Sequence, residues 1–120
     1  MAEILPLVKP GQTRTFTASA TITGGQVVYV SGARTVAPTA GANSAWIGVA
    51  LHDAANGDKV TVGGPAVYEL NSSGAIAAGA LVVSAAAGAV ATIGAGTFDQ
   101  VVGIAESAAA SNKCRVRTFR

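Results

Sequence analysis

Few residues in this chain are of a type that could carry out chemistry. The only histidine, His52, is followed by Asp53, and the only cysteine is Cys114. Consecutive strand residues point to opposite faces, so His52 and Asp53 are not expected to act as an acid–base pair, and no nucleophile is identifiable beside them. The alternation around Cys114 places it opposite its basic neighbours, which predicts a small buried side chain rather than a reactive thiol. We therefore predict no enzymatic activity and assign no catalytic residue.

Metal and cofactor sites are not predicted either. One histidine and six scattered carboxylates show no ligand spacing, and a lone cysteine can form neither an intrachain disulfide nor a cysteine-based metal cluster. The glycines match no phosphate-binding loop of the GxGxxG or GxxxxGK[ST] type. We expect no cofactor, no metal and no small-molecule substrate.

The elements that would position these residues are strands. Apolar residues alternate or occur in short β-branched runs, and no long window has helical periodicity. Strands are expected near Arg14–Thr23, Gln26–Ser31, Trp46–Leu51, Lys59–Val62, Ala66–Leu70, Ala80–Ser84, Val90–Ile93, Val101–Ala105 and Lys113–Phe119.

An internal repeat covers most of the chain. Thr21–Val28 aligns with Ala75–Val82 at a spacing of 54 residues, and Ile47–Ala50 aligns with Val102–Ala105 at a spacing of 55. Gly48 and Gly103 are equivalent in this alignment, and glycine inside apolar strand sequence indicates a bulge, a bend or close backbone approach. Two copies of one β-unit are the simplest explanation.

We predict an all-β fold: a small single-domain β-barrel or sandwich over residues 13–120, built from repeat halves at about 13–70 and 71–120. Each half is expected to have about four strands, too few to bury a face alone, so the two should pack together with a pseudo-twofold. Residues 1–12 lie ahead of the repeat, and Pro6 and Pro10 favour an extended N-terminal arm. The arm either reaches a neighbouring molecule or forms an edge strand of its own domain.

The net charge is only +2, but the basic residues are unevenly distributed. Half of the eight lie near the C-terminus, and a period of two places Lys113, Arg115 and Arg117 on one face of a strand. This basic stripe could meet acidic protein or nucleic acid, or be the solvated face of an edge strand. Since Phe119 is the only aromatic residue beside the stripe, nucleic acid is not a predicted partner.

A membrane span is also not predicted. Asn71–Phe98 contains no charged residue and is long enough to cross a bilayer as a helix. Its glycines weaken a helix, however, and alanine, serine and threonine contribute little insertion energy. The N-terminus has an acid where a secretory signal has basic residues, so we expect synthesis in the cytoplasm without export.

Several segments together resemble a known family. Ile47–Val62 follows the pattern V-G-V-A-x-x-D-A-A-x-G-x-x-V-x-V, with Ile47 at its first position, and the apolar strand Ala66–Leu70 comes after it. Ala75–Val82 is similar to the pattern A-I-A-A-G-x-x-V, and Val102–Ala109 to a closing V-G-I-A-x-x-A-A. In these features the chain resembles phage capsid cement, or head decoration, proteins over roughly residues 11–119.

The resemblance implies a non-enzymatic virion protein that is synthesised in the host cytoplasm. It is expected to bind the major capsid protein on the outer surface of the assembled head as a homo-oligomer, with a trimer favoured. The alternative is another virion structural module, such as a tail or fibre domain. The candidate contacts to the capsid or to a sister subunit lie in the arm and near the C-terminus: Ile4, Leu5, Leu7, Val8, Lys9, Lys113, Arg115, Arg117 and Arg120.

Overall fold

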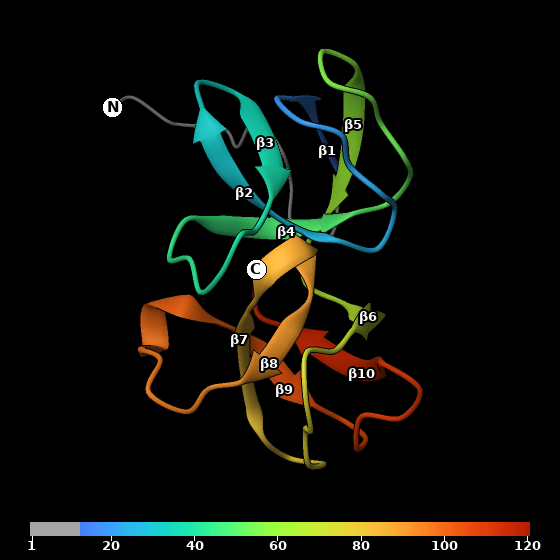
Figure 1. Ribbon diagram of the computed structural model, residues 1–120. Coiled ribbons are helices and arrows are strands. Elements are labelled where there is room, and N and C mark those ends of the chain that lie inside the picture. Colours follow the sequence, from blue (N-terminus) through green and yellow to red (C-terminus); the bar gives the residue numbers. More distant parts are fainter. Residues whose placement is uncertain (1–12) are drawn as a thin grey trace, which may run out of the picture.

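The computed structural model describes residues 13–120, and the first repeat forms a closed barrel of five strands in the order β1-β3-β2-β4-β5 (Figure 1). These strands are β1 (Arg14–Ala18), β2 (Val27–Gly32), β3 (Thr35–Pro38), β4 (Trp46–Ala50) and β5 (Lys59–Gly63). β1 closes the barrel because it pairs in parallel with β3 on one side and antiparallel with β5 on the other. Closure leaves this sheet without an open edge.

The second repeat forms a five-stranded sheet in the order β6-β10-β9-β7-β8, below the barrel in Figure 1. Its strands are β6 (Val67–Asn71), β7 (Leu81–Ser84), β8 (Val90–Thr92), β9 (Val101–Ala105) and β10 (Lys113–Thr118). Because β6 pairs with β10 in this sheet, the second unit begins before the boundary expected near residue 71. Two short 3-10 helices, η1 (Ala86–Gly88) and η2 (Phe98–Gln100), lie between strands of this repeat. Beyond the parallel bridge between Ser72 and Val90, β6 and β8 are not paired in the part of the chain that the structure describes, so this sheet stays open.

The two units share one pairing pattern. At a spacing of 54, the Ser72–Val90 bridge is the counterpart of the Ala18–Val36 pair that closes the barrel. The β-bulge after Val28 in the β2–β4 pair recurs after Val82 in the β7–β9 pair. The all-β fold built from repeated units is thereby confirmed.

The equivalent glycines explain how closely the strands approach. A Cβ atom on Gly48 would overlap the carbonyl oxygen of Gly63, and one on Gly103 would overlap the carbonyl oxygen of Arg117. Gly63 and Arg117 are themselves 54 residues apart. Both glycines therefore mark the same close backbone approach, one of the outcomes predicted for them.

The strand boundaries differ from expectation at two places in the first repeat. The strand predicted over Arg14–Thr23 ends at Ala18, and Ile22 forms only an isolated bridge with Ala54. The strand β3 was not predicted, because its four residues end in a proline and gain strand structure only from pairing with β1 and β2. With this fifth strand the barrel closes within the first repeat rather than around both.

The apolar stretch between residues 71 and 98 forms β7, η1 and β8. No helix that the structure describes has the length and hydropathy needed to cross a membrane.

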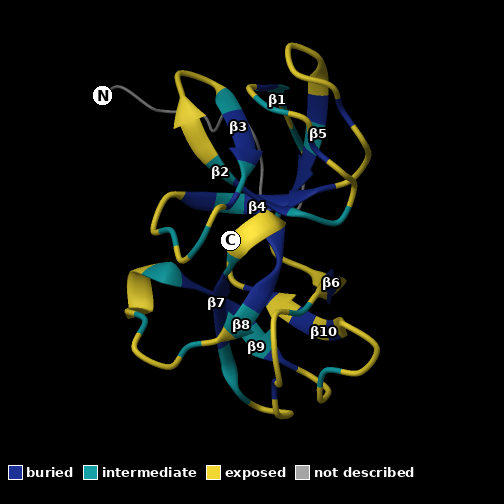
Figure 2. Ribbon diagram, viewed as in Figure 1, coloured by how far each residue is buried: buried dark blue, intermediate teal, exposed yellow. Residues whose placement is uncertain are grey.

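Two hydrophobic clusters make up the core, and strands of the barrel contribute to both. Val28 and Ala50 belong to the cluster inside the barrel, whereas Val27, Trp46 and Val49 belong to the cluster of the second sheet. Neighbouring strand residues face opposite sides, so β2 and β4 pack on their own barrel with one face and on the second sheet with the other. Figure 2 shows buried residues along β3, β4 and β5, with exposed residues at the loop tips.

Polar contacts join the two units beside this shared core. Ser84 is buried, accepts the Asn43 N–H at 2.9 Å and donates to the Gly41 oxygen at 3.0 Å. Thr39, also buried, donates its hydroxyl to the Ala85 oxygen at 2.8 Å. These bonds satisfy buried polar groups of both repeats and hold the units in one orientation.

Candidate contact surfaces

The basic stripe lies on β10. Residues of this strand alternate between exposed and buried, with Lys113, Arg115 and Arg117 on the exposed face. The predicted alternation is confirmed, because Cys114 and Val116 between them belong to the buried core. The stripe therefore faces solvent from the second sheet.

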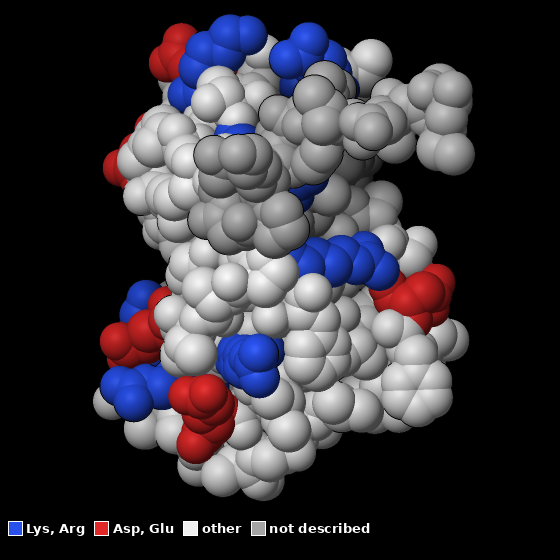
Figure 3. All heavy atoms as spheres, turned by 180° about the vertical axis from the view of Figure 1, so that it is seen from behind, with Lys and Arg blue, Asp and Glu red and all other residues white. Residues whose placement is uncertain are grey.

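Its surroundings differ from those of an edge strand. β10 pairs with β6 on one side and β9 on the other, so the interpretation of the stripe as a charged edge is wrong. Arg115 lies directly opposite the exposed Glu69, and Glu106 donates its N–H to the Arg115 oxygen at 2.8 Å. Figure 3 shows acidic side chains beside the basic ones on the lower unit. The stripe is part of a mixed-charge surface.

Arg120 does not extend this stripe. Its Nη1 donates to the carbonyl oxygens of Ser44 at 2.8 Å and Trp46 at 2.7 Å, and its Nη2 donates to the Asp99 oxygen at 3.1 Å. Figure 1 shows the C-terminus between the two units. The four basic residues grouped by sequence therefore separate into an exposed group of three and one that bridges the repeats.

Two exposed aromatic residues flank the position of Arg120. Phe98 in η2 is 83% exposed, and Phe119 after β10 is 54% exposed. Asp99 follows Phe98 and Arg120 follows Phe119. These two neighbours are joined by the hydrogen bond from Arg120 Nη2 to the Asp99 oxygen. Phe98 was missed from the sequence, where a lone aromatic residue in a Gly/Thr-rich loop carries no periodic signal.

The structure also contains a polar cavity of about 230 Å³ that was not predicted from the sequence. It is lined by Thr15, Phe16, Thr17, Ala33, Arg34 and Lys59. The residues come from three separate segments that meet only because β1 inserts between β3 and β5. No local motif indicates that β1 pairs with β3 and β5, so the cavity could not be predicted from the sequence.

The residues first considered for chemistry do not form an active site. The Thr61 N–H donates to His52 Nε2 at 3.1 Å, which leaves Nδ1 to carry the proton and donate to the Asp53 oxygen at 2.8 Å. Cys114 lies in the core of the other repeat, where burial raises the pKa of its thiol. Within residues 13–120, no three His, Cys, Asp or Glu side chains are grouped as metal ligands would be. The remaining candidate contacts, in the arm (Ile4, Leu5, Leu7, Val8 and Lys9), lie outside the described residues.

Comparisons with known proteins agree with this architecture. The sequence model of the family described as phage cement protein matches residues 8–118. The solved N base of the head fiber gp8.5 of bacteriophage phi29 is 18% identical with a TM-score of 0.63, and the alignment covers 90% of this chain and 93% of that chain. No curated protein matches. Because the family match spans nearly all of its length, this chain belongs to the phage cement protein family, whose members are non-enzymatic structural proteins of the phage virion.

Proposed function

We propose that this protein decorates the outer surface of an assembled phage head and stabilises the shell against dissociation. The family match over residues 8–118 is the observation that carries the proposal. The fold supports it, because the second unit presents exposed faces of β6 and β10 that are available for contact with a shell.

The mechanism needs only selective binding. A protein that binds assembled shell protein but not its dissociated form stabilises the shell by mass action. Several weak contacts made by one oligomer add through effective concentration, so no single contact has to be strong. We propose a homo-oligomer, with a trimer favoured, and the major capsid protein as the partner.

Two sets of residues are proposed as contacts. The first is the apolar arm with Ile4, Leu5, Leu7, Val8 and Lys9, which precedes the repeated unit. The second is the exposed stripe of Lys113, Arg115 and Arg117 on β10. Arg120 is the weakest of the nine candidates, since its guanidinium already bonds three carbonyl oxygens of this chain.

A second function has one observation in its favour. The similar fold from phi29 is the base of a head fiber, and the alignment covers 93% of that chain. By analogy this protein would anchor a fibre or another projecting module to the virion. The two functions differ in copy number, because a decoration protein occupies every equivalent site of a shell whereas a tail or fibre part is present in few copies.

Cosedimentation of the purified protein with undecorated heads tests the proposal. Saturable binding at a fixed number of copies per capsomer, together with a higher dissociation temperature of the heads, is the expected result. Binding at only a few sites per particle would favour the fibre-base function, and no binding to heads would overturn the decoration function.

A further inference from the structure

Two cationic side chains from distant parts of the first repeat line one cavity. Arg34 comes from the turn between β2 and β3, and Lys59 is the first residue of β5. We define the cavity of about 230 Å³ that they line with Thr15, Phe16 and Thr17 as the Arg34–Lys59 pocket. Its lining contains no carboxylate.

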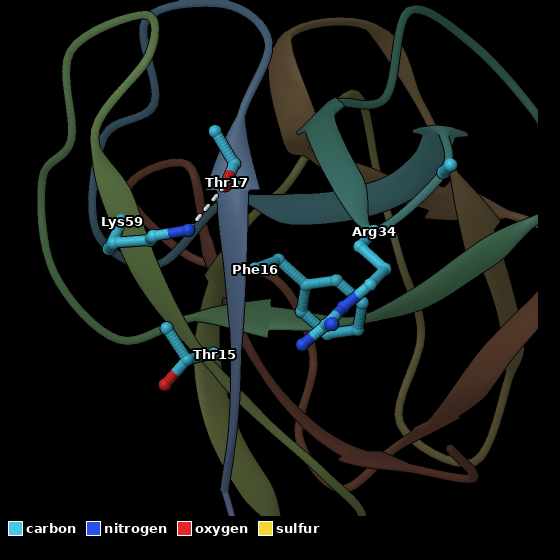
Figure 4. A pocket seen from close by; sticks show the side chains of 6 residues that line it. Thr15, Phe16, Thr17, Arg34 and Lys59 are labelled. Atoms are coloured by element: carbon cyan, nitrogen blue, oxygen red, sulfur yellow. Dashed lines mark hydrogen bonds between the residues drawn. The ribbon is translucent and has the colours of Figure 1, made fainter.

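The pocket places polar and aromatic groups around the two cations. Lys59 Nζ donates to Thr17 Oγ1 at 3.0 Å, which holds the ammonium group against β1 (Figure 4). Arg34 and Phe16 are labelled in the same view and also line the pocket. Arg14, whose guanidinium carbon lies 5.5 Å from the centroid of that ring, adds a third positive charge nearby. Because no carboxylate lines the pocket, these positive charges favour an anion inside it.

The turn that carries Arg34 has a backbone conformation that favours glycine. Arg34 has a φ of 59°, in the left-handed region that costs conformational energy for every residue with a Cβ atom. Gly88, its counterpart at a spacing of 54, has a φ of 70°. A glycine thus suits this turn in the second repeat, while the first repeat keeps an arginine there despite the strain.

The second repeat also shows what the pocket lacks. Lys59 corresponds to Lys113 and Thr15 corresponds to Glu69, each at a spacing of 54. Both Thr15 and Glu69 are exposed. The second repeat therefore carries its own carboxylate at the position where the first repeat has only a threonine hydroxyl.

We propose that the Arg34–Lys59 pocket is a carboxylate-binding site, which takes an aspartate or glutamate side chain from the surface of the phage head. This inference rests on the decoration function proposed above and adds the chemistry of one contact. A planar guanidinium matches a carboxylate with two parallel hydrogen bonds, and the ammonium of Lys59 supplies a second charge. The Phe16 ring offers an apolar surface to the methylene groups of the incoming side chain.

A titration of the free protein tests the pocket without heads. Amide chemical shifts are followed by NMR while a glutamate hexamer is added at low ionic strength. The expected shifts centre on Thr15, Thr17, Arg34 and Lys59. The double variant Arg34→Gly with Lys59→Gln should bind at least about tenfold more weakly, because charge-assisted bonds are lost. Arg34→Gly keeps the left-handed turn, so the fold should persist.

Matched measurements decide whether the site is specific. Arg115→Gln removes one exposed cation from β10 and should leave the hexamer affinity and the shift pattern unchanged. Equal affinity of the double variant and the unmodified protein would overturn the inference. Inorganic phosphate or a short oligonucleotide that binds the pocket as well as the glutamate hexamer would overturn its assignment to carboxylates.

Head binding then separates the two proposals. The double variant should cosediment with undecorated heads about tenfold more weakly than the unmodified protein. The charge-preserving double variant Arg34→Lys with Lys59→Arg is the control and should keep most of the affinity. If the double variant binds heads with unchanged affinity, the head is not the source of the carboxylate and the decoration function stands. If the unmodified protein does not bind heads, the decoration function fails, and so does the head as the source of the carboxylate.

Discussion

The guanidinium of Arg120 lies 4.8 Å from the centroid of the Trp46 ring, and its Nη1 donates to the Trp46 carbonyl oxygen at 2.7 Å. Trp46 begins β4 of the barrel and is buried in the core of the second sheet. Arg120, which follows the last strand of the second repeat, therefore covers the Trp46 ring. Through this ring the first repeat contributes to the shared core.

Replacing Arg120 should loosen this junction. Arg120→Ala removes three hydrogen bonds to carbonyl oxygens and the cation–π contact, so we expect the free energy of unfolding to fall by about 1–2 kcal/mol. Guanidinium denaturation followed by tryptophan fluorescence measures this directly. The control is Arg117→Ala, an exposed arginine on β10, which should change stability by less than about 0.5 kcal/mol. Equal effects of the two substitutions would contradict the bridging role of Arg120.

The close backbone approach at Gly48 and Gly103 predicts that a single added methyl group strongly destabilises the protein. Gly103→Ala would place a Cβ atom in the carbonyl oxygen of Arg117, so β9 and β10 would have to separate. We expect a loss of roughly 3 kcal/mol in thermal or chemical unfolding. At Gly41 an added methyl group would meet nothing within 4 Å, so Gly41→Ala should be nearly neutral. A stable Gly103→Ala variant would show that the strands are not in this register.

Ser84 supplies one of the two buried hydroxyls at the junction between the repeats. Ser84→Ala would leave the Asn43 N–H and the Gly41 oxygen without this partner, and should destabilise the protein by about 1–2 kcal/mol. Ser107→Ala, at an exposed position of the same repeat, is the matched control and should have little effect. Calorimetry of both variants makes the comparison, and a loss no greater than that of the control would contradict the bridging role.

The thiol of Cys114 should be unreactive in the folded protein. Burial raises its pKa above the ordinary value of 9.0, and the side chain donates to the Ser107 oxygen at 3.3 Å. Modification by a disulfide reagent at pH 8 should be slow in buffer and rapid in denaturant, because the thiolate is the reacting species. Rapid modification of the native protein would place Cys114 at the surface.

The raised pKa values of Cys114 and Tyr68 predict a loss of stability at alkaline pH. Burial raises the pKa of Cys114 above 9.0 and that of Tyr68 above 10.0, so the unfolded chain loses these protons first. The stability contributed by the neutral forms is complete below the unfolded pKa values and declines as pH rises through the folded ones. Unfolding free energies measured between pH 7 and pH 11 should decline above about pH 9. Cys114→Ser should remove the part of the decline that begins at the lowest pH.

Much of the fold could be predicted from local pattern. The alternation of small apolar residues and the spacing of 54 indicate a repeated β-unit, and the equivalence of Gly48 and Gly103 indicates a shared close approach. These features are readable because they depend on neighbouring residues and on an internal copy. The strand β3 could not be read this way, since its four residues become a strand only between two partners.

The candidate surface was predicted less completely, for the same physical reason. A period of two is enough to place Lys113, Arg115 and Arg117 together, but not to show that Glu69 lies opposite Arg115. By itself the sequence determined the β-rich, repeated and catalytically empty character of this chain, because side-chain type and local periodicity carry that information. Only the tertiary structure decided that one repeat closes and the other stays open, that Arg120 bridges them, and that Arg34 and Lys59 line one pocket. Those outcomes depend on which distant strands pair, and pairing energy comes from contacts that no local segment contains.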